Sequence, residues 1–219
     1  MSKPKILVIG GGKHAIVVAY NLIEQAKYEI AAFVTTDCTT QSSFLGYPLI
    51  SSYKNFDVEA TDELRDKFAT SLFHVGFGAM SYRKKVYDFF VSQGWTAVNI
   101  IHPSAVVAPA TQLGNGILIE AGCLITPNPV IGNNVVINTG SQVNHDNIIH
   151  DHAYLASGVI TSGTIEIGEQ TLIDDGVIIA MNRKVGSNCI IGAGSVVTKD
   201  IPSGVIAYGN PCRVIRENL

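Results

Sequence analysis

A period of six residues runs through the second half of the chain. From Ile101 to Val197 every sixth residue is aliphatic except Thr161, so sixteen of seventeen phased positions obey the rule. An α-helix has 3.6 residues per turn and a β-strand alternates every two, so neither produces this spacing. A hexapeptide β-helix does, because each hexad supplies one short strand and one corner. The period therefore predicts an all-β parallel β-helix.

Small residues and glycines suggest the number of hexads in each coil. The fifth position of the hexad is usually small. Glycine follows the leading aliphatic residue five times, and four of these glycines lie 18 residues or a multiple of 18 apart: Gly114, Gly132, Gly168, Gly186, with Gly192 outside the series. We expect three hexads per coil, with glycine's conformational freedom needed at one corner. Residues 101–202 would then form between five and six coils.

The first hundred residues have a different pattern. β-rich runs at 5–9, 30–34, 71–76 and 95–101 alternate with helical spacing at 14–27 and 83–92. Alternating strands and helices favour a parallel, Rossmann-like α/β sheet. We therefore divide the chain into a Rossmann-like domain at 1–100 and a β-helix domain with a C-terminal tail at 101–219.

Composition narrows the class of protein. The 219 residues are 47% hydrophobic and 15% charged, with a formal net charge of −3, which argues against disorder and against a basic nucleic-acid surface. No apolar run approaches the length of a spanning helix, and the run before Gly11 is too short for a signal-peptide core. The four cysteines form no CxxC pair. We expect reduced thiols, no zinc site, no membrane insertion and a cytoplasmic location.

A histidine beside an aspartate is the strongest catalytic signal. His145-Asp146 lies in a stretch that holds three of the six histidines. A neighbouring carboxylate favours a protonated imidazole and can fix its orientation and tautomer, as a general base requires. One coil later, Thr161 breaks the aliphatic rule and Gly163 falls opposite His145. A glycine there would admit a ligand, and its N–H could stabilise an oxyanion. The alternative is a solvated corner histidine, and the combined features favour catalysis.

Two other histidines have the spacing of a metal site. His150 and His152 flank Asp151, but no third ligand is signalled. A structural role is the favoured interpretation, and we expect no metal.

A glycine-rich turn follows the first strand. Gly10-Gly11-Gly12-Lys13-His14-Ala15 fits G-x-G-x-x-A before a helix, where free N–H groups suit a phosphate. A dinucleotide-binding site also has an acidic residue at the end of the second strand. Here Asp37, after Thr35 and Thr36, matches that position only loosely. This favours a nucleotide or diphosphate over NAD, and the alternative is a turn without ligand.

Together these motifs resemble a known family. The glycine turn with its histidine, the phased hexads, Asn-His-Asp and the closing Tyr-Gly-Asn-Pro resemble bacterial sugar N- and O-acyltransferases with a left-handed β-helix. Within them the chain is similar to the N-acetyltransferases of nucleotide-linked 4-amino sugars in the bacillosamine, viosamine and perosamine pathways. The resemblance covers essentially the whole chain.

The resemblance implies roles for particular residues. His145 would be the catalytic base and Asp146 its acidic partner, which is often Glu in the family. Gly163 would meet the acetyl carbonyl. The acetyl-CoA side would also include Tyr154, Asp175, Ala193, Gly209, Asn210 and Pro211. The nucleotide sugar would be held by Gly12, Lys13, His14, Thr35, Thr36, Asp37, Gly76 and Asn138. Lys13 departs from the usual Ser or Gly, and Cys212 replaces the commoner alanine.

The expected activity follows from these roles. Acetyl would pass from acetyl-CoA directly to the 4-amino group of a nucleotide-diphospho-deoxysugar, within lipopolysaccharide or O-antigen biosynthesis. The family's trimers bind acetyl-CoA between neighbouring prisms, which implies a homotrimer here. The first alternative is an O-acetyltransferase of the sialic acid type. The second is a non-catalytic protein that binds nucleotide sugars.

Overall fold

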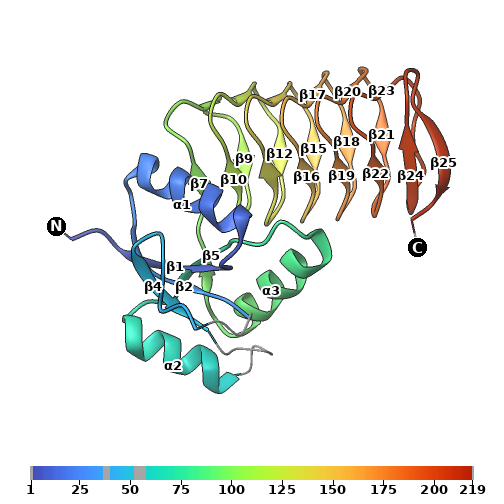
Figure 1. Cartoon of the computed structure of the whole chain (residues 1–219). Helices are drawn as coiled ribbons and strands as arrows, with labels where there is room; N and C mark the ends of the chain where they lie inside the picture. Colours follow the sequence, from blue (N-terminus) through green and yellow to red (C-terminus); the bar gives the residue numbers. More distant parts are fainter. Residues whose placement is uncertain (1, 37–39, 52–57, 219) are drawn as a thin grey trace. The chain divides into compact units, whose positions relative to one another are not determined.

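The computed structural model describes residues 2–36, 40–51 and 58–218, in two compact units, Met1–Ile100 and Ile101–Leu219 (Figure 1). Asp37 and Cys38 lie outside the described residues. None of the helices within these ranges is both long enough and apolar enough to cross a membrane.

The first unit is an α/β domain with a six-stranded sheet. The strand order is β3-β4-β2-β1-β5-β6, parallel except for the β3–β4 hairpin. The strands are β1 (Lys5–Ile9), β2 (Glu29–Val34), β3 (Ser43–Phe44), β4 (Tyr47–Ile50), β5 (Leu72–Val75) and β6 (Thr96–Ala97). The helices are α1 (Lys13–Gln25), α2 (Val58–Phe68) and α3 (Met80–Ser92). The four predicted strands and two predicted helices are present.

Alternating residues of the central strand serve the two faces of this sheet. Leu7 and Ile9 belong to one buried cluster with Leu64 of α2 and Phe90 of α3. Val8 points to the opposite face. There a β-carbon at Gly76 would meet Val8 and Ala15 of α1. From β1 the chain first adds β2 and β4 on one side of the sheet and later adds β5 and β6 on the other side. The topological switch point of the sheet therefore lies between β1 and β5.

Helix α1 was predicted correctly, but its buried face differs from the pattern that revealed it. Ala15, Val18, Ala19 and Leu22 are buried, whereas three of the spaced apolar residues are exposed: Ile16, Tyr20 and Ile23. Both sets recur at intervals of three and four, so periodicity alone identifies the helix and not its inner face.

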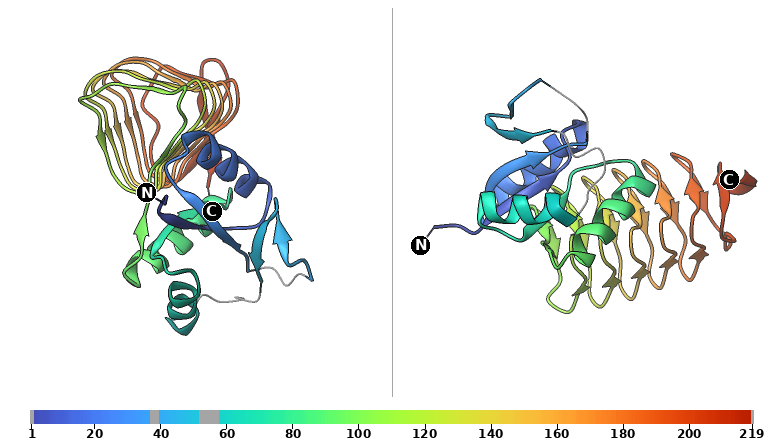
Figure 2. Two further views of the ribbon diagram at one scale, coloured as in Figure 1. Left: turned by 90° about the vertical axis from the view of Figure 1, so that its left-hand side faces the viewer. Right: turned by 90° about the horizontal axis from the view of Figure 1, so that it is seen from below.

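The second unit is a left-handed parallel β-helix with 18 residues per coil. Its coils lie one above another and form three parallel sheets (Figure 2). Each two-residue strand pairs with the strand 18 residues away, for example Leu124 with Val106 and with Gln142. The predicted three hexads per coil are therefore correct.

The strands of the three sheets are as follows. The first sheet contains β7 (Ile100–Ile101), β10 (Leu118–Ile119), β13 (Val136–Ile137), β16 (Tyr154–Leu155), β19 (Leu172–Ile173), β22 (Ile190–Ile191), β24 (Val205–Tyr208) and β25 (Arg213–Glu217). The second contains β8 (Val106–Val107), β11 (Leu124–Ile125), β14 (Gln142–Val143), β17 (Ile160–Thr161), β20 (Ile178–Ile179) and β23 (Val196–Val197). The third contains β9 (Gln112–Leu113), β12 (Val130–Ile131), β15 (Ile148–Ile149), β18 (Glu166–Ile167) and β21 (Lys184–Val185).

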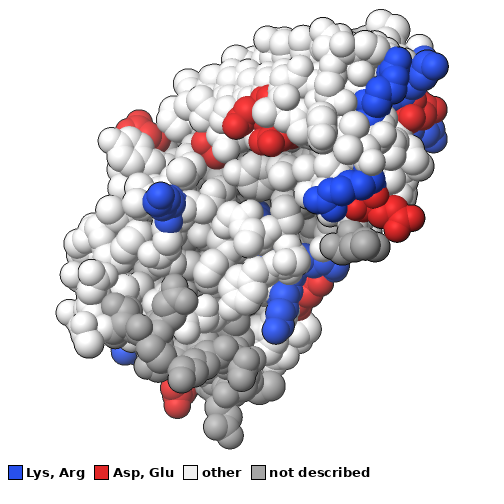
Figure 3. All heavy atoms as spheres, turned by 45° about the vertical axis from the view of Figure 1, so that its right-hand side comes forward, with Lys and Arg blue, Asp and Glu red and all other residues white. Residues whose placement is uncertain are grey.

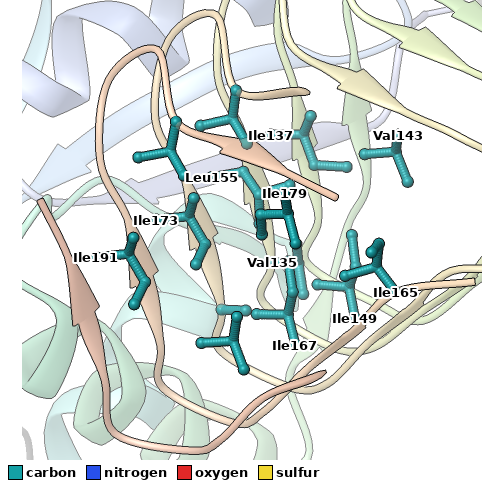
Figure 4. Packing of buried hydrophobic residues seen from close by; sticks show 14 of the residues in the cluster. Val135, Ile137, Val143, Ile149, Leu155, Ile165, Ile167, Ile173, Ile179 and Ile191 are labelled. Atoms are coloured by element: carbon teal, nitrogen blue, oxygen red, sulfur yellow. The ribbon is translucent and has the colours of Figure 1, made fainter. Parts of the chain in front are cut away.

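The leading hexad residues stack inside the prism. Ile137, Leu155, Ile173 and Ile191 form one column of buried aliphatic side chains, seen in Figure 4. Thr161 is also fully buried, in the column that contains Val143 and Ile179. The end of the chain is not a loose tail: β24 extends the first sheet in parallel, and β25 pairs with it antiparallel.

The explanation expected for one series of glycines was wrong. Gly114, Gly132, Gly168 and Gly186 do not have positive φ. A β-carbon at Gly132 would instead lie 2.7 Å from the backbone nitrogen of Asp151, one coil above. Close approach of neighbouring coils, not conformational freedom, therefore requires glycine there.

Left-handed residues occur at other positions in the coils. One column is formed by glycines with φ of 66 to 70°: Gly122, Gly140, Gly158, Gly176 and Gly194. Two further columns have non-glycine residues, and one of these contains Asn128, Asp146, Thr164 and Asn182. Asn and Asp tolerate this conformation better than most residues do.

Candidate active site

His145 and Asp146 lie in the turn between β14 and β15. Nδ1 of His145 is 2.8 Å from Oδ2 of Asp146, and about half of each side chain is exposed. This bond, with a second from the Asn128 amide at 3.3 Å, lowers the pKa of the Asp146 carboxyl. An ionised carboxylate can only accept, so Nδ1 carries the shared proton, and in the neutral imidazole the lone pair is then on Nε2. Nε2 is therefore the atom that can take a proton.

Gly163 lies directly against the His145 ring. A β-carbon at residue 163 would collide with Cε1 and Nε2 of the imidazole, so only glycine allows the ring its position. The carbonyl of Gly163 accepts from the N–H of Asn182 at 3.2 Å, while its own N–H has no acceptor among the described residues. Gly163 thus lies beside Nε2 of His145, the position that the stacking argument predicted.

A groove of about 300 Å³ borders this turn. It is lined by Asp146, Ile148, Thr164, Ile165, Glu166, Asn182 and Lys184. Lys184 is 2.6 Å from Glu166, whose other oxygen is 3.1 Å from Nε2 of His150. The Lys184 bond, then the His150 bond, lowers the pKa of Glu166, and Glu166 in turn raises the pKa of Lys184. Both apolar side chains and an ion pair therefore line the groove.

Four of the residues expected on the acetyl-CoA side or at the acceptor lie at a different corner: Asn138 after β13, Tyr154 in β16, Asp175 after β19 and Ala193 after β22. Nδ2 of Asn138 donates to the Tyr154 hydroxyl at 3.2 Å, and Ser157 links Asn138 to Asp175 through its hydroxyl and N–H. Exposed Ala193 follows Asp175 by one coil, with Gly194 N–H donating to the Asp175 carbonyl. The second sheet separates this corner from His145.

Glu120 belongs to the same corner and was not predicted. It lies one coil before Asn138, is buried, and accepts a hydrogen bond from the Thr139 hydroxyl at 2.9 Å. Burial raises the pKa of its carboxyl. A single acid at a position that varies between hexads gives no sequence signal.

The segment 209–211 lies beside the last coil. The carbonyl of Gly209 accepts from Val196 N–H, and Gly209 N–H donates to the Ser195 hydroxyl, both at 3.0 Å. Asn210 and Pro211 are exposed there.

The glycine turn of the first unit lies at the carboxyl ends of β1, β2 and β5. Gly10 N–H donates to the Val34 carbonyl, and a β-carbon at Gly10 would overlap the backbone of Gly76. A β-carbon at Gly11 would contact buried Thr35. Gly12 starts α1 with no side-chain cap and with open space around it. Lys13 is exposed and Thr36 half-buried beside the undescribed Asp37. The structure thus brings most of the predicted nucleotide-sugar residues together at the switch point, where α/β sheets bind ligands.

Arg83 fixes His14 at this turn, and sequence reasoning missed it. The buried guanidinium donates to the carbonyls of Val75 and Phe77 and lies 3.3 Å from Nε2 of His14. A guanidinium cannot accept, so Nε2 is the acceptor and Nδ1 holds the proton. Burial, then Arg83, lowers the pKa of His14 to about 3. His14 is therefore neutral, with its proton on Nδ1.

The remaining histidine and cysteine predictions concern metals and nucleophiles. His152 is buried against the Asn134 amide, and His150 pairs with Glu166, so the two rings have separate partners. Residues 2–36, 40–51 and 58–218 contain no group of three side chains able to hold a metal. Burial raises the pKa of the Cys123 thiol to about 11, and that of Cys212 is also raised. Cys123, Cys189 and Cys212 are free and buried, as expected of thiols that are not nucleophiles.

Surface charge is sparse on the face drawn in Figure 3. Lys and Arg are scattered there, some beside Asp or Glu and others apart from them, with wide areas of other residues between.

Two family descriptions match parts of the chain. "PglD N-terminal domain" matches residues 5–90, and "Bacterial transferase hexapeptide (six repeats)" matches residues 164–199. A comparison with curated protein sequences found no match.

Solved structures are similar over nearly the whole chain. A perosamine N-acetyltransferase from Caulobacter crescentus, solved with CoA and GDP-perosamine, is 32% identical over 97% of both chains, with a TM-score of 0.89. The acetyltransferase domain of PglB from Neisseria gonorrhoeae, solved with acetyl coenzyme A, is 28% identical over 98% of this chain and 100% of that domain, with a TM-score of 0.86. WeeI from Acinetobacter baumannii shares the fold at 23% identity and a TM-score of 0.82.

Proposed function

Because the chain belongs to the PglD-type sugar N-acetyltransferases with hexapeptide repeats, we propose that it moves acetyl from acetyl-CoA to the 4-amino group of a nucleotide-diphospho-4-amino-deoxysugar. The observation that carries this proposal is the His145–Asp146 pair against Gly163. The Caulobacter relative, which binds CoA and GDP-perosamine, supports the choice of an amine acceptor over a hydroxyl.

The chemistry proceeds by direct attack. The neutral amine adds to the thioester carbonyl, and Nε2 of His145 removes a proton from the nitrogen as the C–N bond forms. Asp146 holds the ring through Nδ1 and stabilises the imidazolium, while the Gly163 N–H donates to the oxyanion. Collapse of the tetrahedral intermediate expels CoA thiolate, which recovers the proton. No residue is acylated, since the described cysteines are buried and the pKa values of Cys123 and Cys212 are raised.

The two substrates use different domains in this proposal. Residues 1–100 hold the nucleotide sugar at the β1–α1 turn, through Gly12, Lys13 and His14. Residues 101–219 bind acetyl-CoA, with Tyr154, Asp175, Ala193 and 209–211 along its path, while Asn138 reaches the acceptor. The family resemblance suggests a role in lipopolysaccharide or O-antigen synthesis, and the expectation of reduced thiols suggests that it acts in the cytoplasm.

A homotrimer would complete the site. Within one chain, His145 and the Asn138–Tyr154 group lie at different corners of the prism. Packing of neighbouring prisms would bring one corner of each chain to the other corner of its neighbour, with acetyl-CoA between them. Sedimentation of the purified protein tests this: a stable, active monomer would contradict it.

The experiment for the function is an acceptor panel. The purified protein is given acetyl-CoA with UDP-, dTDP- and GDP-linked 4-amino sugars, and with matched 4-hydroxy sugars, while CoA release and product mass are followed. We expect an added acetyl group on one or more amino sugars and none on the hydroxy sugars. Acetylation of a hydroxy sugar alone, or no thioester cleavage with any acceptor, would overturn the proposal.

A further inference from the structure

Thr161 is the one polar residue among the leading hexad positions, and it lies fully inside the prism. It pairs with Val143 on one side and with Ile179 on the other. A buried hydroxyl in an aliphatic column is tolerated only when it is hydrogen-bonded. Its partners therefore indicate what the polar residue does.

Every hydrogen bond of the Thr161 hydroxyl is made with the coil that carries His145. The hydroxyl donates to the Gln142 carbonyl at 3.2 Å. It accepts from Nδ2 of Asn147, which is 1% exposed, and from the N–H of Asn144 at 3.4 Å. The carbonyl of Thr161 accepts from Nδ2 of Asn144 at 2.7 Å.

The two asparagines stand on either side of the catalytic pair. Asn144 precedes His145, and Asn147 follows Asp146. Asn147 is also tied to the next coil, since its Oδ1 accepts from Ile165 N–H at 2.7 Å. Asp146 has a left-handed backbone with φ of 58°, as have Asn128, Thr164 and Asn182 at the same corner of the other coils. Thr161 and Asn147 hydrogen-bond this turn from inside the prism, which an aliphatic leading residue cannot do.

We propose that Thr161, through Asn144 and Asn147, is a positioning residue that fixes the turn at residues 144–147 and so holds the His145 imidazole against Gly163. The inference rests on the proposed role of His145 as base. Thr161 itself is buried and touches no substrate; it acts only through the turn.

The test compares three substitutions of buried hydroxyls. Thr161→Val keeps the shape and restores the aliphatic rule but removes the hydroxyl, whereas Thr161→Ser keeps it. The matched control is Thr171→Val, because the Thr171 hydroxyl is equally buried but bonds only to the backbone of Gly186 and Cys189. We assay each with acetyl-CoA and GDP-perosamine, or whichever nucleotide amino sugar the panel identifies.

We expect Thr161→Val to lower kcat about tenfold or more while both KM values stay within twofold, since ring placement affects the transition state more than binding. Thr161→Ser should retain most of kcat, and Thr171→Val should alter only the melting temperature. If Thr161→Val fails to fold, Asn144→Ala replaces it: Asn144 is partly exposed, so water can solvate the Thr161 carbonyl and preserve the fold, but water cannot hold the turn in place. A kcat within twofold of wild type for whichever variant folds would overturn the inference.

A double-mutant cycle separates this inference from the proposed function. In a His145→Ala background, Thr161→Val should cause no further loss, because the residue that it positions is gone. An equal loss in both backgrounds would make Thr161 a merely structural residue and would overturn the inference. If His145→Ala retained wild-type kcat, both the proposed base and the role of Thr161 would be overturned. If His145→Ala were inactive and Thr161→Val fully active, only the role of Thr161 would be overturned.

Discussion

At the scale of single residues, Gly163 and Gly132 are glycines for different reasons. The missing β-carbon of Gly163 leaves room for the His145 ring, whereas that of Gly132 leaves room for the Asp151 backbone. A side-chain ring can swing aside, but a coil backbone cannot.

We therefore predict that Gly163→Ala lowers kcat about tenfold to a hundredfold with little change in melting temperature, because the added carbon displaces the imidazole and obstructs the N–H donor. Gly132→Ala should do the reverse, lowering the melting temperature and leaving kcat of the folded protein unchanged. Both variants are measured by thermal unfolding and steady-state kinetics. If Gly163→Ala loses stability but its folded fraction turns over normally, the glycine is only a structural corner.

The residues of the candidate site were predictable to different degrees. His145 and Asp146 could be found because they are neighbours in the sequence, and Gly163 because an 18-residue period converts sequence separation into stacking. Asn147 and Arg83 could not, since an asparagine at a corner and an arginine in a helix are ordinary there. Their roles arise from buried hydrogen bonds to Thr161 and His14, and these depend on three-dimensional packing.

At the scale of elements, the β1–α1 turn contains two glycines with opposite surroundings. Gly10 has φ of 146° and touches the Gly76 backbone, so the fold itself requires glycine there. Gly12 caps α1 with φ of −104°, and a β-carbon there would meet nothing within 4 Å. Packing within the chain therefore does not require glycine at position 12. We expect a bound ligand to occupy the open space beside it.

Gly12→Ala should therefore raise KM for the nucleotide sugar several-fold while the melting temperature and KM for acetyl-CoA hold. A glycine-to-alanine change at a helix cap costs less than about 1 kcal/mol, which leaves the fold intact. Kinetics with each substrate varied in turn distinguish the effects. An unchanged KM for the nucleotide sugar would mean that the turn does not face the ligand.

Elements were predicted as well as their patterns allowed. The hexad phase predicted the strands from β7 to β23, because a narrow prism requires one inward aliphatic residue per strand, whereas β24 and β25 follow the last hexad. The hairpin of β3 and β4 and helix α2 were missed, since short edge strands and a polar helix carry weak periodicity. The glycines after the leading residues were identified, but the reason predicted for them, a positive φ, was wrong. Sequence alone cannot distinguish a positive φ from a close approach of two backbones.

At the scale of the whole molecule, two histidines make the first unit sensitive to acid. Burial is the main cause that lowers the pKa values of His14 and His74 to about 3. In the unfolded chain both histidines have their ordinary pKa near 6.5. Between pH 6.5 and 3 they are therefore protonated in the unfolded chain and neutral in the native protein. The contribution of the two histidines to the free energy of unfolding is therefore fully present above about pH 6.5. It decreases as the pH falls from there toward 3.

The expected decline is up to about 1.4 kcal/mol per pH unit for each histidine. Trp95 is the only tryptophan and is 3% exposed within the first unit, so its fluorescence during urea unfolding reports that unit. Between pH 7.5 and 5.0 the free energy of unfolding should fall, and His14→Asn should weaken this dependence markedly. An identical pH dependence in the variant would show that His14 does not titrate on unfolding.

The central claim is that His145 removes the proton of an attacking amine. The most direct measurement is kcat of His145→Ala with acetyl-CoA and the nucleotide amino sugar that the wild type accepts, alongside both KM values and the melting temperature. Loss of a general base predicts a kcat roughly 10² to 10⁴ lower, with the KM values and the fold preserved. A folded variant with kcat within threefold of wild type would contradict the account.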